Sequence, residues 1–341
     1  MDRRRLRIAT YNVEWFHALF DDDGHLLDTN AWSGRHDVTR AQQIAGLTRV
    51  FRAMDADAVL VVEAPDISRR RNGAVALENF ARAAGVRARE VCFGFANDTQ
   101  QEIMLLYDPD VVRATHAPSD FGAPRFDGEF RIDLDVDATE DLVIFSKPPL
   151  EMRLDTPLGR IRMIGVHVKS KAPHGARDAD HAMKISIANR RKQLAQCIWL
   201  RRRVEAHLAQ REPLILLGDL NDGPGLDVFE DLFGRSGVEI VMGWGEDEAG
   251  LMYDPHAARA LERRIVAAPT TARFYIASEG RYLSALLDYI MVSPDLRPMA
   301  RRWRVWHPFE DPACWEDEGL RDALLMASDH FPVTLDLEAE G

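Results

Sequence analysis

Acidic and amide side chains stand at the ends of apolar, strand-like segments of this 341-residue sequence. The segment 213–223 reads PLILLGDLNDG, an apolar run that ends abruptly at Asp219 and Asn221. Side chains two residues apart on a strand point to the same face, so we expect these two to lie close together. Groups of this kind activate water, bind a hard cation or hold an anion. The motif therefore indicates either a turn or a functional site.

Five further segments end in, or contain, a polar group of the same kind. They place Asn12 after RIATY, Glu63 after AVLVV, His167 after RMIGV, Asp288 within LLDYIMV, and Asp329 and His330 before FPVTL. Taken singly, each has a structural explanation as a turn, a strand end or a core histidine. Asp288 fits that explanation poorly, because a buried carboxylate without a partner is costly. An imidazolium partner such as His330 removes this cost and stabilises the charged ring.

Six motifs in this order resemble those of the endonuclease/exonuclease/phosphatase superfamily, which has the deoxyribonuclease-I-like fold. They are TYNVEWF, VVEAPD, GVHVKSK, GDLND, LDYIMVS and SDHFPV. Each motif is short, but six in order at strand ends make a specific signal that spans roughly residues 6–337. The resemblance implies an α/β (α+β) fold, a four-layer sandwich of two packed mixed β-sheets flanked by helices, with the site where the sheets meet.

The resemblance also implies hydrolysis of a phosphoester with a divalent cation. Mg²⁺ prefers a few carboxylate oxygens together with water and substrate phosphate, so sparse acids suit it better than a His/Cys cage. We therefore expect Mg²⁺, with Mn²⁺ or Ca²⁺ as possible substitutes. By resemblance, Glu63 binds the metal, Asn12 positions the metal or its water, and Asp329 is a second acid on the metal side.

The remaining implied roles belong to the reaction itself. By resemblance, Asp219 orients or deprotonates the attacking water, and Asn221 donates a hydrogen bond to a phosphoryl oxygen. His330 stabilises the charge that develops on the phosphoryl oxygens or protonates the leaving group, and Asp288 holds the ring of His330 in position.

A second histidine indicates the branch of the family. His167 in HVKSK resembles the second catalytic histidine of the deoxyribonuclease-I branch, which a strand glutamate orients. The matching glutamate here is Glu102 in QEIMLLYDP, so we expect it to contact His167. Lys169 either contacts phosphate or is a solvent-facing strand end. The triplet Arg69–Arg71 either grips a polyanion near the metal or is a solvated face.

Three functions stay open at this point. The paired histidines favour a nuclease that cuts DNA or RNA phosphodiesters with a divalent metal, and this is the function that we expect. The balance of 43 basic against 55 acidic residues gives a net charge of −12, which favours a phosphodiesterase or phosphatase acting on a small or lipid phosphoester. A non-catalytic binding protein on the same fold is the third possibility. No partner protein can be inferred.

The pattern of apolar residues predicts the elements that position these groups. We expect helices over 39–54, 74–84 and 183–210 and a mixed stretch with one or two short helices over 224–285. Strands are expected over 6–13, 57–63, 88–95, 102–107, 142–146, 149–154, 160–168, 213–218, 286–292, 302–306 and 331–337. We expect one catalytic domain over residues 1–341. With no signal-peptide pattern or membrane-spanning run, we expect a cytoplasmic protein, or a secreted one if a leader segment has been removed.

Overall fold

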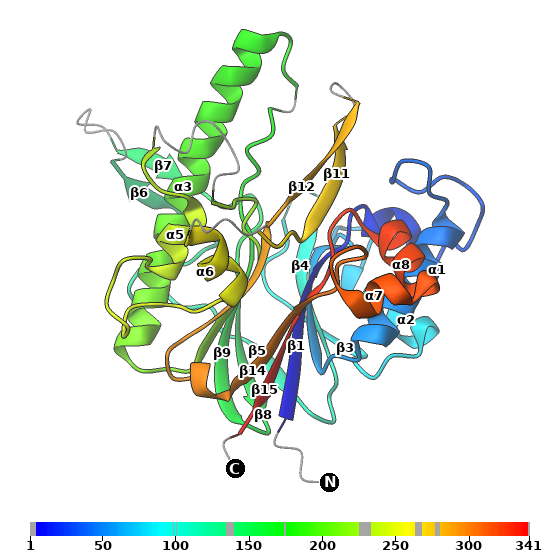
Figure 1. Cartoon of the computed structure of the whole chain (residues 1–341), viewed down its shortest axis with the longest axis horizontal. Coiled ribbons are helices and arrows are strands. Elements are labelled where there is room, and N and C mark those ends of the chain that lie inside the picture. Colours follow the sequence, from blue (N-terminus) through cyan, green and yellow to red (C-terminus); the bar gives the residue numbers. More distant parts are fainter. Residues whose placement is uncertain are drawn as a thin grey trace.

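Two mixed β-sheets pack face to face between two layers of helices (Figure 1). The structure is a computed structural model that describes residues 5–97, 99, 101–133, 140–173, 175–224, 233–262, 268–276 and 280–339. Figure 1 shows α1, α2, α7 and α8 beside one sheet and α3, α5 and α6 beside the other. The predicted four-layer α/β sandwich is confirmed.

The first sheet has six strands in the order β14-β15-β1-β2-β4-β3. Their bounds are β1 Arg5–Asn12, β2 Ala58–Ala64, β3 Glu90–Phe93, β4 Glu102–Tyr107, β14 Ala300–Val305 and β15 Val333–Glu338. Strands β1 and β2 are parallel, and their neighbours run antiparallel to them. The carboxyl ends of β1 and β2 therefore lie side by side, which brings Asn12 and Glu63 to the same edge.

The second sheet has five strands in the order β13-β10-β9-β8-β5. Their bounds are β5 Arg113–His116, β8 Leu150–Thr156, β9 Gly159–His167, β10 Leu214–Asp219 and β13 Asp288–Val292. Strands β9 and β10 are parallel and in register, with His167 beside Asp219. Strand β13 is antiparallel to β10 and places Asp288 opposite Asp219. Two small antiparallel pairs complete the strands, β6 Phe130–Ile132 with β7 Asp141–Val143 and β11 Ala272–Ile276 with β12 Arg281–Ala285.

The helices cover the outer faces of the sheets. They are α1 Arg40–Met54, α2 Gly73–Ala84, α3 Ala179–Ala209, α5 Gly237–Met242, α6 Pro255–Leu261, α7 Pro312–Glu316 and α8 Glu318–Ala327, with 3₁₀ turns η1 Phe16–Leu19 and η2 Arg297–Met299. The predicted start of α1 is confirmed, because Thr39 caps the helix and Gln42 completes a capping box. Figure 1 shows that the amino-terminal end of α3 and the β11–β12 hairpin extend beyond the sheets at the same end of the molecule.

The strands are apolar on both faces because each sheet is covered on both sides. On β10, Ile215 and Leu217 join the core between the two sheets. Leu214 and Leu216 join the core between the second sheet and the helices. The first sheet divides its side chains in the same manner, with Ile8 between the sheets and Tyr11 beneath the helices. A continuous apolar run that ends in a polar residue is therefore a strand that crosses the sandwich and stops at its edge.

Most predicted elements are present, and several further ones are found. Strands β5, β6, β11 and β12 and helices α7 and α8 lie where no element had been predicted. The mixed stretch 224–285 contains two short helices, as expected, and also the β11–β12 hairpin; its residues 225–232, 263–267 and 277–279 lie outside the described residues.

Candidate active site

The polar strand ends of both sheets line one cavity of about 580 Å³. The predicted residues that line it are Asn12, Glu63, His167, Lys169, Asp219, Asn221, Asp329 and His330. Strands β1, β2, β9 and β10 each contribute a residue, so the cavity lies where the carboxyl ends of the two parallel pairs face each other. Asp288 lies directly behind the cavity, in contact with His330.

Asp219 is fully buried and held by amide groups. Asn12 Nδ2 donates to its Oδ2 over 3.0 Å, and the backbone N–H of Asn221 donates to its Oδ1 over 2.7 Å. Asn221 Nδ2 also donates to Oδ2, over 3.1 Å. Burial, followed by the negative charge of Asp288, raises the pKa of Asp219 to about 7. A carboxyl with this pKa can take up a proton from water near neutral pH.

Asp219 and Asn221 meet through a turn, which differs from the strand geometry that we expected. Strand β10 ends at Asp219, and Asn221 has a left-handed backbone with φ of 49°. Glycine is required just before, at Gly218, where φ is +132° and an added Cβ would lie 2.1 Å from the carbonyl oxygen of Val166. The two side chains are close together as predicted, but a tight turn brings them together.

His330 and Asp288 form a buried ion pair. His330 Nδ1 lies 2.7 Å from Asp288 Oδ2, which also accepts a hydrogen bond from the Thr271 hydroxyl over 2.9 Å. Burial alone would lower the pKa of His330, but the charge and hydrogen bond of Asp288 outweigh it and hold that pKa well above its ordinary value. The ion pair therefore favours the imidazolium form of His330, which lines the cavity. Such a group stabilises developing negative charge or donates a proton.

Glu63 and Asn12 provide the oxygen atoms that suit a hard cation. The backbone of Glu63 has φ of 58°, and Gln101 Nε2 donates to its Oε2 over 2.5 Å. Burial raises the pKa of Glu63, while the positive charges of Lys147 and His330 oppose that rise. Asn12 Oδ1 is buried and accepts no hydrogen bond from the described residues. An orphaned amide oxygen beside the carboxylates of Asp219 and Glu63 fits a divalent cation with oxygen ligands.

His167 is held by a lysine that the sequence did not indicate. Lys147 Nζ lies 3.0 Å from His167 Nδ1 and donates to Gln101 Oε1 over 2.5 Å. A lysine ammonium has no acceptor, so the His167 Nδ1 must accept and the proton sits on Nε2. Nε2 lies 3.6 Å from Asp219 Oδ2 and 3.9 Å from Glu63 Oε1. Burial, with Lys147 next, lowers the pKa of His167 well below its ordinary value, so the ring is neutral.

The expected contact between Glu102 and His167 is wrong. Asn97 Nδ2 donates to one carboxylate oxygen of Glu102 over 2.7 Å, and the backbone N–H groups of Ile67 and Asn97 approach the other at 3.4 Å. Glu102 is buried at the start of β4, and its hydrogen bonds connect the loop that contains Ile67 to the loop that contains Asn97. The ring of His167 faces Lys147 on one side and the carboxylates of Glu63 and Asp219 on the other.

Sequence reasoning missed several residues of the cavity. Glu14 lines it, pairs with Arg35 and accepts a hydrogen bond from Trp15 Nε1 over 3.0 Å. Burial, followed by the charge of Asp329, raises the pKa of Glu14 to about 7. Its position two residues after Asn12 is a signal that could have identified it. Lys147 and Gln101 lie in loops whose approach to the site no local pattern reveals.

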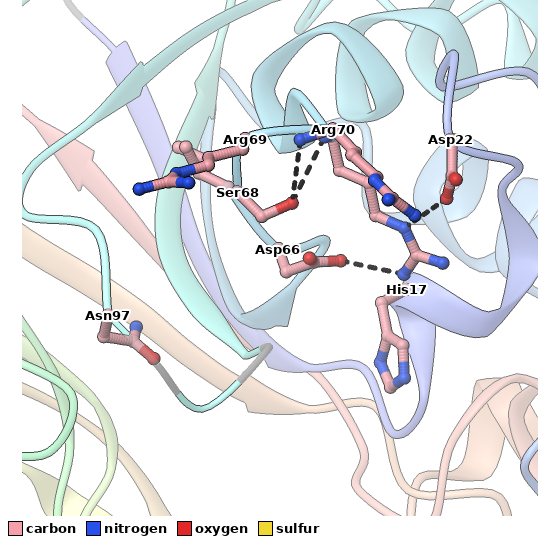
Figure 2. A pocket seen from close by; sticks show the side chains of 9 residues that line it. His17, Asp22, Asp66, Ser68, Arg69, Arg70 and Asn97 are labelled. Atoms are coloured by element: carbon pink, nitrogen blue, oxygen red, sulfur yellow. Dashed lines mark hydrogen bonds and ion pairs between the residues drawn. The ribbon is translucent and has the colours of Figure 1, made fainter.

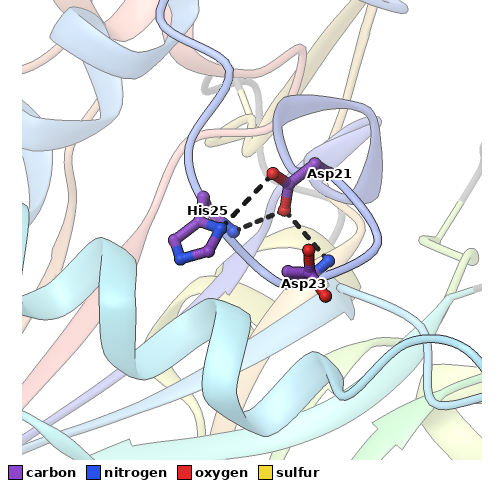
Figure 3. A group of neighbouring side chains, drawn as sticks. All are labelled: Asp21, Asp23 and His25. Carbon is purple, nitrogen blue, oxygen red and sulfur yellow. Dashed lines mark hydrogen bonds and ion pairs between the residues drawn. The ribbon is translucent and has the colours of Figure 1, made fainter.

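A second acidic group, Asp21 with Asp23 and His25, has a structural explanation. Figure 3 shows the three side chains in one loop, with ligand-type atoms within 4.8 Å of one another. Asp21 Oδ1 accepts hydrogen bonds from the backbone N–H groups of Asp23 and His25, over 3.0 and 2.8 Å. These bonds close the loop on itself, and we assign no metal to it.

The motifs of the cavity lie within one family model. A model described as the endonuclease/exonuclease/phosphatase family matches residues 9–330. The chain belongs to this family. Membership in the endonuclease/exonuclease/phosphatase family makes the protein a phosphoric ester hydrolase, and it agrees with the order of the six motifs. The sequence has no significant match among curated proteins.

Solved structures of the same fold include an AP endonuclease and a TDP2. The AP endonuclease LMAP from Leishmania major is similar with a TM-score of 0.54 and 15% identity, over 100% of this chain and 90% of that chain. A truncated TDP2 from Caenorhabditis elegans is similar with a TM-score of 0.50 and 13% identity, over 98% of each chain. At these identities the likeness is one of fold alone. Within the described residues, no helix is long and apolar enough to cross a membrane.

Proposed function

We propose that the protein is a divalent-metal-dependent phosphodiesterase that cleaves nucleic acid by attack of water on phosphorus. The observation that carries the proposal is that a proton acceptor and a positively charged group line the same cavity. Asp219, with a pKa of about 7, and the imidazolium of His330 face the same space from two different sheets. A base for water and a cation for the developing phosphoryl charge are what this hydrolysis requires.

We assign each residue of the cavity a role in the hydrolysis. Asp219 orients the attacking water and accepts its proton, while Asn12 and Asn221 hold the carboxylate in place. His330 stabilises the charge on the phosphoryl oxygens, and Asp288 keeps its ring protonated and oriented. The neutral His167 offers an Nε2–H donor to a phosphoryl oxygen.

The metal would be held by Glu63 and Asn12, with Asp329 at the same side of the cavity. A bound divalent cation supplies charge neutralisation at the phosphoryl oxygens. We propose Mg²⁺, because the oxygen atoms available are few and hard. Lys169 also lines the cavity and is placed to contact the substrate, and its backbone N–H donates to Gln196 Oε1 over 2.9 Å.

A small or lipid phosphoester is the second candidate substrate. The net charge of −12 favours it, because a strongly acidic protein repels long polyanions. The donors around the phosphoryl position favour the nuclease. A diester carries one negative charge, which grows on the phosphoryl oxygens as water attacks, and His330, Lys147 and Lys169 are among the residues that line the cavity and can offset it.

A panel of substrates tests the proposal. Purified protein is incubated with plasmid, single-stranded DNA, RNA, sphingomyelin, simple monoesters and bis(p-nitrophenyl) phosphate, with Mg²⁺ or Mn²⁺ and with a chelator. We expect metal-dependent cleavage of bis(p-nitrophenyl) phosphate and of nucleic acid. Activity that persists in chelator would refute the metal assignment. Intact nucleic acids beside a cleaved small diester would move the substrate to the second class.

A further inference from the structure

A second cavity, of about 760 Å³, lies beside the catalytic one and carries an arginine-rich turn (Figure 2). The turn follows β2, the strand that ends near Glu63, and leads into α2. It contributes Arg69, Arg70 and Arg71 to the wall of the cavity. None of these side chains has a part in the reaction described above, so their presence here requires a separate explanation.

Backbone and side-chain hydrogen bonds fix the shape of the turn. The N–H of Ser68 donates to the carbonyl oxygen of Arg71 over 3.0 Å, and an isolated bridge joins Ile67 to Asn72. The Ser68 hydroxyl accepts the N–H of Arg71 over 3.2 Å. Arg69 therefore stands with Arg70 at the tip of a closed turn. A ligand that binds there does not have to order the backbone first.

The three arginines differ in how they are paired. Arg71 Nε lies 2.7 Å from Asp22, and its Nη1 lies 3.2 Å from Asp66. Arg69 and Arg70 are exposed, and within the described part of the chain neither guanidinium forms an ion pair. In Figure 2 the Arg69 side chain points away from Asp22, and no interaction is drawn to its guanidinium. Arg71 thus anchors the turn, and the two tip arginines are available to an anion.

The two cavities adjoin along two separate segments of the chain. Glu63 lines the catalytic cavity and Asp66 the second one, and three residues of extended chain span at most about 10 Å. Likewise, Gln101 lines the first cavity and Asn97 the second, and Asn97 Nδ2 donates to the carbonyl oxygen of Gln101 over 3.1 Å. One extended ligand can therefore occupy both cavities.

The geometry points to a second phosphate subsite at Arg69 and Arg70, which binds a backbone phosphate of a polynucleotide strand whose scissile phosphate lies at Asp219 and His330. This inference rests on the proposed function. A polynucleotide offers phosphates at regular intervals along one strand, which matches two anion sites joined by a short path. Paired guanidiniums suit phosphate because they present several N–H donors in a fixed fork.

The subsite is positively charged, although the protein as a whole carries a net negative charge. The cavity wall carries three arginines against two aspartates, Asp22 and Asp66, while the whole chain has a net charge of −12. Because ion pairs with these aspartates neutralise Arg71, the unpaired positive charge concentrates at the tip of the turn. A polynucleotide strand bound at Arg69 and Arg70 leaves the catalytic cavity on one side. The substrate therefore binds in one orientation.

A double substitution with a matched control tests the subsite. Arg69→Gln with Arg70→Gln is compared with Arg301→Gln with Arg302→Gln, which removes the same charge from the exposed β14. We measure hydrolysis of bis(p-nitrophenyl) phosphate, which has one phosphate and cannot reach the second cavity. Binding of a fluorescent single-stranded oligodeoxythymidylate is measured by anisotropy in chelator, over a range of salt concentrations.

The subsite predicts that both double variants hydrolyse the small diester like the wild type. The Arg69/Arg70 variant should bind the oligonucleotide about 10-fold or more weakly, with a salt slope reduced by about one to two. Equal affinity in the two double variants would overturn the subsite. So would weaker binding of a soluble inositol polyphosphate with unchanged oligonucleotide binding, which would assign the turn to another ligand. Failure of the wild type to hydrolyse the small diester would instead refute the proposed function, and the anisotropy comparison would still decide the subsite.

Discussion

At the scale of single residues, burial and a neighbouring charged group set the pKa values of Asp219 and His330. Asp219 is buried among amides and a second carboxylate, so its pKa rises to about 7. His330 is buried against Asp288, so its pKa rises above its ordinary value of about 6.5. Burial therefore favours a proton acceptor at Asp219, whereas at His330 the carboxylate of Asp288 outweighs burial and favours a cation.

The ion pair between His330 and Asp288 should act as one unit in catalysis. We expect His330→Ala to lower kcat on bis(p-nitrophenyl) phosphate on the order of 10²-fold or more, because the phosphoryl charge loses its cation. Asp288→Asn should lose most of the same factor, and the double variant should be little worse than either. Asp336→Asn, which removes a carboxylate paired with Arg7 away from the cavity, is the control. Additive losses would show that the two residues act independently.

We expect Lys147 to determine which ring nitrogen of His167 carries the proton. We expect Lys147→Met to lower kcat about 10-fold or more, because Nδ1 loses its donor and the Nε2–H is no longer fixed. Lys147→Arg should restore part of the activity, since arginine can also donate to Nδ1. The ¹⁵N chemical shifts of the His167 ring report the tautomer directly. Protonated Nδ1 in the wild type would contradict this assignment.

At the scale of elements, the loops between strands decide which side chains meet. Glu102 illustrates the point, because it starts a strand of the first sheet and turns toward the loops at Ile67 and Asn97. Its partners lie in the turn that leads to α2 and in the loop after β3, both of which border the second cavity. We therefore propose that Glu102 supports the walls of the site rather than acting in the reaction.

Glu102→Gln should keep near-normal activity and change how stability depends on pH. Burial raises the pKa of Glu102 to about 7 from an ordinary value of about 4.5. The folded state thus holds the proton more tightly, and the stability gained is complete below about pH 4.5 and lost as pH rises through about 7. The variant has no such loss, so at about pH 8 its melting temperature should equal or exceed that of the wild type.

Two measurements check this assignment. Thermal unfolding is followed from about pH 4 to about pH 8, where the difference between the two proteins should grow with pH. Activity is compared with that of Glu63→Gln, which removes the proposed metal ligand and should be nearly inactive. A loss in Glu102→Gln as large as in His167→Ala would restore the role of Glu102 as the partner of His167.

The sequence predicted the sandwich well because its strands are long apolar runs that stop at polar residues. Asn12, Glu63, His167 and Asp219 each end a strand or follow its last apolar residue, so their meeting at one edge follows from the fold. Contacts made by loops were beyond this reasoning. Lys147 reaches His167 from between two strands, and its sequence neighbours, two prolines, indicate only a turn.

Missed elements have a similar physical reason. Helix α8 buries Leu320 and Leu324 against the first sheet, but its ten residues are preceded by a polar, aspartate-rich stretch that resembles a loop. The β11–β12 hairpin exposes Tyr275 and Tyr282, so it lacks the alternation of a half-buried strand pair. Elements that bury little surface carry little periodicity.

At the scale of the whole molecule, both sheets share one core. Side chains of β1, β2 and β15 pack against those of β8, β9 and β10 between the sheets. Since neither sheet can bury this face alone, we propose that residues 1–341 form a single catalytic domain that unfolds in one transition. The candidate active site lies across the same interface, so we expect a cation bound there to link the two sheets as well.

Divalent metal should therefore stabilise the whole protein, and more strongly at high pH than at low pH. In the metal-free protein the pKa of Asp219 is about 7, so stability is lost as pH rises from about 3.8 through about 7 and the buried carboxylate becomes charged. A cation beside Asp219 and Glu63 offsets that charge, and it binds only when protons have left. The rise in melting temperature on adding Mg²⁺ should be small at about pH 5.5 and several degrees at about pH 8.

Differential scanning calorimetry with and without Mg²⁺ at these two pH values measures the effect. The control is Asp219→Asn, which removes the titrating charge and should make the shift nearly independent of pH between the two values. A single transition that moves as a whole indicates that both sheets respond together. Two transitions, with only one shifted by Mg²⁺, would mean that the sheets unfold separately and that the cation binds to one of them. If Mg²⁺ raised the melting temperature of the wild type equally at both pH values, the cation would not bind beside Asp219 and Glu63. The proposed link between metal binding and the interface of the two sheets would then be wrong.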